Sequence, residues 1–257
     1  MQHSPDELKS LAEEALERLD LWPELHGQAT SVRYSLEVGC KRVRPVIALA
    51  VGEALGAPVT QVMPAALAIE LVHTFSLVHD DLPAMDDDDE RRGRPSTWKK
   101  FGEGVGVLAG DALLAEAFRL ALSYPTTAVA RELAETTLGM IGGQYLDVFS
   151  PEPDRLAVTR LKTGRLFDAA VACGLWAAEV PEGSQAPWRA FASELGVLFQ
   201  LVDDIIDGDG LAAALGEARA RQLADEAADR AQRALAGVDA DTSVLAEIVA
   251  ALAARTA

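Results

Sequence analysis

Two clusters of aspartates are the features of this sequence best suited to chemistry. The first comprises Asp80, Asp81 and the acidic run 86–90, and it follows directly on the apolar segment 65–78. The second comprises Asp203, Asp204 and Asp207, after the mostly apolar segment 197–202. Residues three and four apart share a helix face, so the carboxylates of the second cluster should converge. Like charges near apolar surroundings are costly unless a cation compensates them.

A solvated acidic loop or an exposed helix face is the alternative to a metal site at each cluster. Asp80 and Asp81 argue against it, because they emerge from an apolar helix at its C-terminus, where the macrodipole is already negative. The candidate ligands are all carboxylates, with no cysteine or histidine set at zinc spacing. Hard oxygen ligands suit Mg²⁺, which binds through one or two carboxylates plus substrate phosphates. Two facing clusters around a diphosphate would therefore hold several Mg²⁺ ions.

Dispersed cationic residues accompany the aspartates. Lys41 and Arg44 lie three apart at a predicted helix start, where free N–H groups also favour an anion. Arg91 and Arg92 directly follow the first cluster, and His73 precedes it by seven residues on the same helix face. Each residue alone would read as a surface charge or a core histidine. Together they suggest a site for an anionic substrate.

The composition limits which molecules the protein can bind and in which compartment it can be placed. The 257 residues carry a net charge of −17 with only five lysines, which argues against nucleic acid binding through a basic surface. The two cysteines are too few for a disulfide framework. No signal peptide is evident, and the longest uncharged run, 54–69, is short and broken by glycine and proline. We therefore expect a cytoplasmic protein without a membrane span.

The elements that must position these residues are helices. Ser4, Pro5 and Glu7 form a capping box with proline at the first helical position, and Trp22-Pro23 ends that first helix. Apolar periodicity predicts further helices over 28–38, 42–55, 60–82, 105–123, 126–149, 155–178, 186–207, 211–235 and from 241. The helices 60–82, 155–178 and 186–207 are apolar on most faces and should lie inside. No alternating run is long enough for a sheet. The prediction is one all-α domain, 1–257.

These motifs resemble the trans-isoprenyl diphosphate synthases, the family of farnesyl and geranylgeranyl diphosphate synthases. The matching pieces follow family order as far as Asp207: 39–45, 73–92, Gly142-Gly143-Gln144 with Asp147, Lys162-Thr163-Gly164, and Phe199-Gln200 with 203–207. The nearest likeness is to bacterial farnesyl diphosphate synthases, whose first motif also has four residues between its aspartates. The resemblance implies a helical bundle of the isoprenoid synthase type around a central cavity, and a homodimer.

The resemblance also implies roles for individual residues. It assigns the isopentenyl diphosphate to Lys41, Arg44, His73 and Arg92. It assigns the allylic diphosphate to Arg91 and Lys162, with Gln144 also at the substrate. It makes Asp80, Asp86 and Asp203 the ligands of three Mg²⁺ ions, with Asp81, Asp204 and Asp207 as ligands or as their supports.

The reaction implied is a condensation. The family ionises the allylic substrate, lets the isopentenyl double bond attack the cation, and removes a proton, with released pyrophosphate as the base. Mg²⁺ and the cations would stabilise the leaving pyrophosphate. Thr163, Gln200 and a backbone carbonyl freed by a kink at 162–164 could direct oxygen at the allylic cation. Phe75 and Ser76, five and four residues before Asp80, would set the cavity depth. Farnesyl-producing relatives carry an aromatic at the place of Phe75, so the resemblance implies farnesyl diphosphate as main product and geranylgeranyl diphosphate second.

The sequence departs from the family after Asp207. Relatives continue with a lysine-bearing lid over the allylic diphosphate, whereas no lysine follows Lys162 here. The departure keeps a non-catalytic subunit of a heteromeric synthase open, although such subunits tend to lose aspartates. A class I terpene cyclase also remains open, although it would not need the pocket of cations. A nucleotide site at Gly102, Gly104 and Gly106 is disfavoured, since no strand precedes it.

Overall fold

Helix α4 (Val59–Asp80) lies at the centre of the molecule and carries residues of both predicted substrate sites. It packs against α3 (Val43–Ala54), α6 (Glu103–Ala121) and α9 (Arg165–Ala177). The computed structural model describes residues 2–37, 41–152, 155–208 and 210–256. Within these ranges α4 alone has the length and hydropathy of a membrane span, but 67% of its most apolar window is buried inside the bundle. The prediction that this helix is internal is therefore confirmed.

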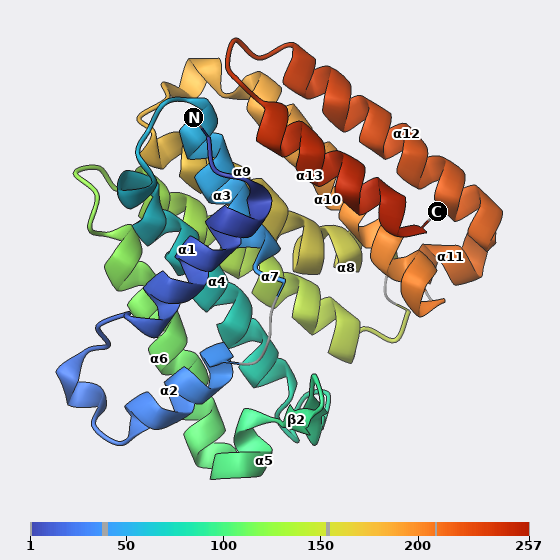
Figure 1. Ribbon diagram of the computed structural model, residues 1–257. Helices are drawn as coiled ribbons and strands as arrows, with labels where there is room; N and C mark the ends of the chain where they lie inside the picture. The colour runs from blue at the N-terminus through green and yellow to red at the C-terminus, as the bar shows by residue number, and fades with distance from the viewer. Residues whose placement is uncertain (1, 38–40, 153–154, 209, 257) are drawn as a thin grey trace.

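The remaining elements complete an all-helical bundle, as the sequence predicts (Figure 1). The first helix starts at the predicted capping box, in which both reciprocal hydrogen bonds of Ser4 and Glu7 are present. The remaining α-helices are α1 (Pro5–Glu17), α2 (Gln28–Glu37), α5 (Thr97–Phe101), α7 (Ala128–Phe149), α8 (Arg155–Thr159), α10 (Ala186–Asp207), α11 (Gly210–Leu215), α12 (Glu217–Ala236) and α13 (Ser243–Ala253). Short 3₁₀ turns are η1 (Pro23–Leu25), η3 (Glu182–Ser184) and η4 (Ala254–Thr256).

The structure differs from the predicted pattern in several elements, among them the short helix α5, which was not predicted. A two-residue hairpin, β1 (Glu90–Arg91) paired with β2 (Arg94–Pro95), follows the first aspartate cluster where no strand was predicted. The predicted helix 155–178 contains a π-helical turn, η2 (Arg160–Gly164), between α8 and α9. The predicted helix 211–235 is broken at Gly216, which has a φ of +87° that most residues avoid.

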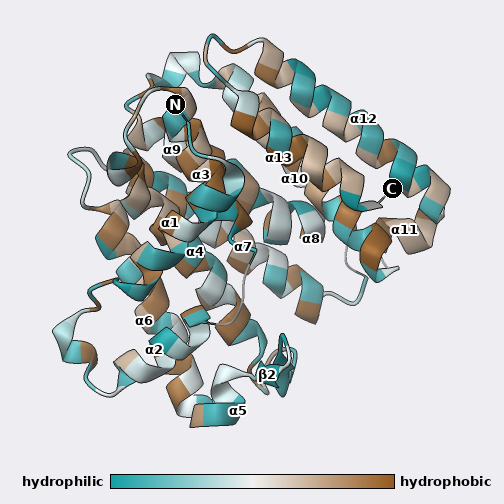
Figure 2. Ribbon diagram, in the orientation of Figure 1, coloured by the Kyte–Doolittle hydropathy of each residue, from teal (hydrophilic) through white to brown (hydrophobic). Residues whose placement is uncertain are grey.

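The C-terminal helices cover α10, the helix that carries the second aspartate cluster (Figure 1). Alanines at positions 220, 224, 227 and 231 of α12 are buried at helical spacing, and such small side chains permit close packing. The outward face of α12 is polar (Figure 2). One cluster of buried apolar residues extends from Leu8 to Leu252, so both ends of the chain contribute to the same core.

Candidate active site

The cationic residues predicted to act together do meet in one pocket. Lys41, Arg44, His73 and Arg92 line a pocket of about 450 Å³, and Asp203 of the second aspartate cluster lines it too. They arrive from the start of α3, the middle of α4, the hairpin and α10. A pocket of this size suits a small ligand. Its charge suits an anion.

Packing holds two members of this pocket in place. The guanidinium of Arg44 lies over the rings of Phe167 and Phe199, 4.9 Å and 5.9 Å from their centroids. Burial holds the pKa of His73 well below its usual value, and the guanidinium groups of Arg44 and Arg92 act in the same direction. His73 is therefore neutral at pH 7, and its single ring N–H can donate a hydrogen bond to an oxyanion.

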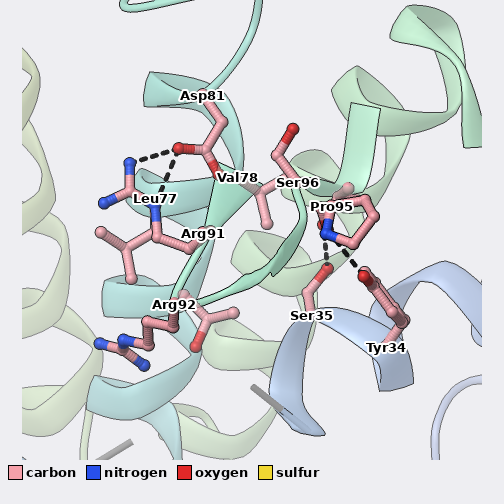
Figure 3. A pocket seen from close by; sticks show the side chains of 11 residues that line it. Tyr34, Ser35, Leu77, Val78, Asp81, Arg91, Arg92, Pro95 and Ser96 are labelled. Carbon is pink, nitrogen blue, oxygen red and sulfur yellow. Dashed lines mark hydrogen bonds and ion pairs between the residues drawn. The ribbon is translucent and has the colours of Figure 1, made fainter. Parts of the chain in front are cut away.

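The hairpin after the first aspartate cluster is fastened to two helices (Figure 3). The guanidinium of Arg91 donates to Asp81, which is buried at the C-terminal end of α4. The hydroxyl of Tyr34 on α2 donates to the carbonyl of Pro95 at 2.7 Å. The cavity between them is only about 20 Å³, too small for a substrate. This region thus positions Arg91 and Arg92 rather than binding a ligand itself.

A second, largely apolar pocket begins at the other predicted substrate residues. Its volume is about 400 Å³, and Asp80 and Lys162 line it together with Phe75 and Ser76. The remaining lining residues are mostly apolar: His79, Met85, Leu114, Met140, Ile141, Gln144, Tyr145 and Phe149. The amide oxygen and nitrogen of Gln144 are buried without a hydrogen-bond partner among the described residues. A buried amide without partners is costly, which favours a polar ligand group at this point.

Sequence reasoning missed His79 as part of this pocket. Its ring meets Phe75 edge-on with centroids 5.1 Å apart, and its Nε2 lies 3.0 Å from the carbonyl oxygen of Val107. Gly110 on α6 makes room for the ring, because a Cβ there would lie 2.1 Å from Nε2. The sequence shows Gly110 only as a glycine in an apolar helix, and it does not reveal that this glycine contacts the His79 ring.

Lys162 joins the apolar pocket to the acidic residues. Its Nζ lies 3.0 Å from Asp147 and 3.9 Å from Asp80. It projects from the π-helical turn η2, in which the amide of Arg165 donates to the carbonyl of Arg160 five residues earlier. A Cβ on Gly143 would lie 2.8 Å from the Leu161 Cβ and 3.0 Å from the backbone nitrogen of Lys162. The absence of a side chain at Gly143 therefore lets α7 approach the turn. The helix is therefore irregular at 162–164, where a kink was predicted, and Thr163 lies within the π-helical turn.

The first aspartate cluster is arranged to attract a cation. Burial raises the pKa of Asp80 to about 6, even though Lys162 opposes the shift. Burial likewise raises the pKa of Asp81, with Arg91 opposing it. Asp86 is exposed, and its backbone amide donates to the carbonyl of Asp80 at 2.9 Å. A divalent cation would offset the cost of ionised Asp80.

The second cluster divides into two parts. Asp203 faces the cationic pocket; burial raises its pKa, while Lys41, Arg255 and Arg44 oppose the shift. Asp207 is exposed at the last turn of α10. Asp204 is buried, where it accepts from Gln200 Nε2 at 2.5 Å and from the Leu211 amide at 2.8 Å. These bonds are those of a supporting residue, which is one of the two roles that the resemblance allows for Asp204. The bond from Gln200 uses its amide nitrogen and not the side-chain oxygen expected to face the allylic cation.

The donor set fits Mg²⁺ bound together with a diphosphate. Among the residues that the structure describes, no three acidic, histidine or cysteine side chains lie close enough to hold a metal alone. Mg²⁺ is commonly held by one or two carboxylates together with substrate phosphates and water. Asp80, Asp86, Asp203 and Asp207 could supply the carboxylates.

Arg219 and Arg221, the two arginines that could take the place of the missing lid lysine, both pair with glutamates of their own helix. Arg219 pairs with Glu226 at 3.7 Å and Arg221 with Glu217 at 2.7 Å, both within α12. Arg255, in the last turn of the chain, instead acts on Asp203. Sequence reasoning missed Arg255, because only the folding of α13 back onto α10 brings it there.

Comparisons with known proteins agree with this geometry. The Polyprenyl synthetase family matches residues 28–228. Farnesyl diphosphate synthase of Bacillus subtilis is 41% identical over 203 residues, 73% of this chain and 68% of that protein. Geranylgeranyl diphosphate synthase of Cyanophora paradoxa is 39% identical over 192 residues, 69% of this chain and 64% of that protein. The chain thus spans about two thirds of the length of these relatives.

A solved structure extends the likeness to the whole chain. The geranyltransferase from Legionella pneumophila superposes with a TM-score of 0.86 at 28% identity, covering 98% of this chain and 96% of that one. A geranyltranstransferase from Thermotoga maritima superposes with a TM-score of 0.78 at 30% identity, covering 99% and 95%. The C-terminal helices beyond the sequence match are therefore also placed as in these structures.

Proposed function

Because the chain belongs to the polyprenyl synthetase family of prenyltransferases, we propose that it condenses isopentenyl diphosphate with dimethylallyl or geranyl diphosphate. The observation that carries this proposal is the pair of pockets on α4. One is cationic and contains His73; the other is apolar and headed by Asp80. A condensing enzyme needs both, since it must hold two diphosphates and one hydrocarbon chain.

The cationic pocket is the proposed isopentenyl diphosphate site. Lys41, Arg44 and Arg92 would neutralise its charge, and neutral His73 would donate a hydrogen bond. The apolar pocket would take the allylic chain, with Lys162 and Arg91 at its diphosphate. Three Mg²⁺ ions, when bound between the aspartate clusters and that diphosphate, would supply the positive charge that makes pyrophosphate a good leaving group.

The protein's own residues then guide the reaction. Breaking the allylic C–O bond leaves the electron pair on pyrophosphate, where Lys162 stabilises the developing charge. The isopentenyl double bond forms the new C–C bond to the allylic cation, and a proton then leaves to pyrophosphate. Thr163, which follows Lys162 in the π-helical turn, and the Gln144 amide, which lines the apolar pocket, would direct oxygen at the allylic cation. The mostly apolar walls would limit water at the cation once a second copy covers Ile141, Tyr145 and Phe149, which are more than half exposed in the single chain.

Product length would follow from the wall of the apolar pocket. Phe75 and Ser76 lie about one turn before Asp80, or roughly 6–7.5 Å along the helix axis. Both line the pocket, with the ring of Phe75 fixed against His79. We propose farnesyl diphosphate as the main product and geranylgeranyl diphosphate as the second.

A cytoplasmic homodimer is the proposed form of the enzyme. Leu138, Ile141, Tyr145 and Phe149 form a stripe at helical spacing on α7, each 51–69% exposed. Ile141, Tyr145 and Phe149 also line the apolar pocket, so the stripe favours a second copy that covers the open side of that pocket and offers the same stripe by symmetry.

A single incubation tests the function. Purified protein, Mg²⁺ and isopentenyl diphosphate are mixed with dimethylallyl, geranyl or farnesyl diphosphate, and products are identified by mass spectrometry. We expect mainly the fifteen-carbon diphosphate, abolished by EDTA and by Asp203→Ala. A hydrocarbon formed without isopentenyl diphosphate would instead indicate a terpene cyclase. Activity only after addition of another synthase subunit would indicate that this chain is the partner subunit of a heteromeric synthase. Grafting a lysine-bearing segment after Gly210 would then test whether the missing lid causes the lack of activity.

A further inference from the structure

Arg42, which lies between Lys41 and Arg44 in the sequence, forms a buried ion pair with Glu70. Arg42 Nη1 donates to Glu70 Oε1 at 2.6 Å, and Arg42 Nη2 donates to the carbonyl of Leu36. Arg42 is 6% exposed and Glu70 is 1% exposed. Both terminal nitrogens of Arg42 are therefore engaged inside the protein, although its neighbours Lys41 and Arg44 reach the pocket.

This arrangement is an unfavourable way to gain stability. Removing two charges from water costs much of what their attraction returns, so a buried ion pair is weak evidence of stabilisation. Arg42 also has a φ of +50°, in the left-handed region that arginine rarely adopts. Two unfavourable features at one residue indicate that its geometry serves something other than folding.

The pair connects the elements that carry the pocket. The left-handed turn at Arg42 lies directly before α3, with Arg44 in the first turn of that helix. Glu70 lies three residues before His73 on α4, so the two share a helix face. Arg42 and Glu70 thus join the start of α3 to the turn of α4 next to His73, and both line the same pocket as Lys41 and Arg44.

We propose that Arg42 and Glu70 form a positioning pair, which sets the relative placement of Lys41, Arg44 and His73 and hence the affinity for isopentenyl diphosphate. This inference rests on the proposed function. Arg42 acts through its neighbours, because Glu70 and the Leu36 carbonyl occupy its terminal nitrogens.

The test replaces both charges at once. Arg42→Met combined with Glu70→Met removes the pair without leaving one buried charge unpaired, a change that proteins often tolerate. The matched control is Arg189→Met with Glu132→Met. That pair is 2.9 Å apart, links α10 to α7, and lines neither pocket. Steady-state kinetics for each substrate, melting temperature, and calorimetric titration with isopentenyl diphosphate are measured for all three proteins.

We expect KM and Kd for isopentenyl diphosphate to rise at least tenfold in the Arg42/Glu70 variant. KM for the allylic substrate and kcat should stay within about threefold, and the control variant should match the wild type. An isopentenyl KM within threefold of the wild type overturns the inference, as does an equal rise in both KM values. If the double variant does not fold, Arg42→Lys is measured against the same thresholds, since one ammonium cannot reach both acceptors in the arginine geometry.

The outcome also separates this inference from the proposed function. A wild-type protein that makes no product but binds isopentenyl diphosphate, with a tenfold loss in the double variant, overturns the function and supports the positioning role. A wild-type protein that neither turns over nor binds this diphosphate overturns both.

Discussion

Replacing Asp80 by asparagine should stabilise the metal-free protein while disabling it. The Asp80 side chain is only 11% exposed, and burial raises its pKa to about 6 from an ordinary value of 3.8. Because the folded state holds the proton more tightly than the unfolded chain does, stability is lost as the pH rises from about 4 through 6. Asparagine has nearly the same shape and carries no charge, so it avoids this loss.

The size of the effect follows from the pKa difference. With about 1.4 kcal/mol per pKa unit, the loss in unfolding free energy is about 0.5 kcal/mol at pH 4 and about 1.6 kcal/mol at pH 5. It reaches its full value of about 3 kcal/mol above pH 7. The Asp80→Asn protein should therefore exceed the wild type by up to about 3 kcal/mol at pH 8, with the difference shrinking as the pH falls.

Urea unfolding followed by circular dichroism, in EDTA and at several pH values from 5 to 8, measures this difference. Prenyl transfer assayed at pH 8 with Mg²⁺ should fall by several orders of magnitude in the same variant. Asp86→Asn is the control: it is exposed, so we expect lower activity with little change in stability. An Asp80→Asn protein no more stable than the wild type at pH 8, or a gain that does not vary with pH, would show that burial of the Asp80 carboxylate does not destabilise the metal-free fold.

Three further predictions concern the two pockets. Lys41→Ala and Arg44→Ala should each raise KM for isopentenyl diphosphate more than that for the allylic substrate in steady-state assays; the opposite pattern would show that the diphosphates are exchanged. Phe75→Ala should lengthen the product to twenty carbons, and Gly110→Ala, which displaces the His79 ring by the contact described above, should shorten it; unchanged products by mass spectrometry would place the pocket floor elsewhere. Binding of isopentenyl diphosphate should take up a fraction of a proton at His73, whose pKa is depressed by burial, Arg44 and Arg92 in the free protein; calorimetry in buffers of different ionisation enthalpy should detect it, and His73→Gln should abolish it.

The sequence sufficed for the features that depend on local pattern. The apolar helix predicted at 60–82 is α4, observed at Val59–Asp80, and the capping box at Ser4 is formed. Periodicity and capping motifs report such features, since both are properties of neighbouring residues. The shared pocket of Lys41 and His73 was instead implied by the family resemblance, because the two residues lie on different elements.

Features set by tertiary packing were not predictable in the same way. Arg42 reads as one more surface cation between Lys41 and Arg44, and only the fold buries it against Glu70. Asp204 belongs to an aspartate motif, but the return of the chain at Leu211 gives its carboxylate a backbone partner. Arg255 is far from any motif in the sequence. In each case the deciding partner comes from a segment that periodicity cannot place.

The π-helical turn at Arg160–Gly164 makes this protein sensitive to a change in chain length. Such a turn holds one residue more than the α-helix on either side of it. Deleting a single residue there would let α8 and α9 run as one regular helix with the phase of both flanks kept, because the extra residue is confined to the turn itself. The core face of α9 would be preserved, while the irregular turn that places Lys162 beside Asp80 and Asp147 would be lost. A lineage could therefore lose prenyl transfer through one codon deletion with its fold intact, whereas building the turn from a regular helix requires an insertion that no series of substitutions supplies.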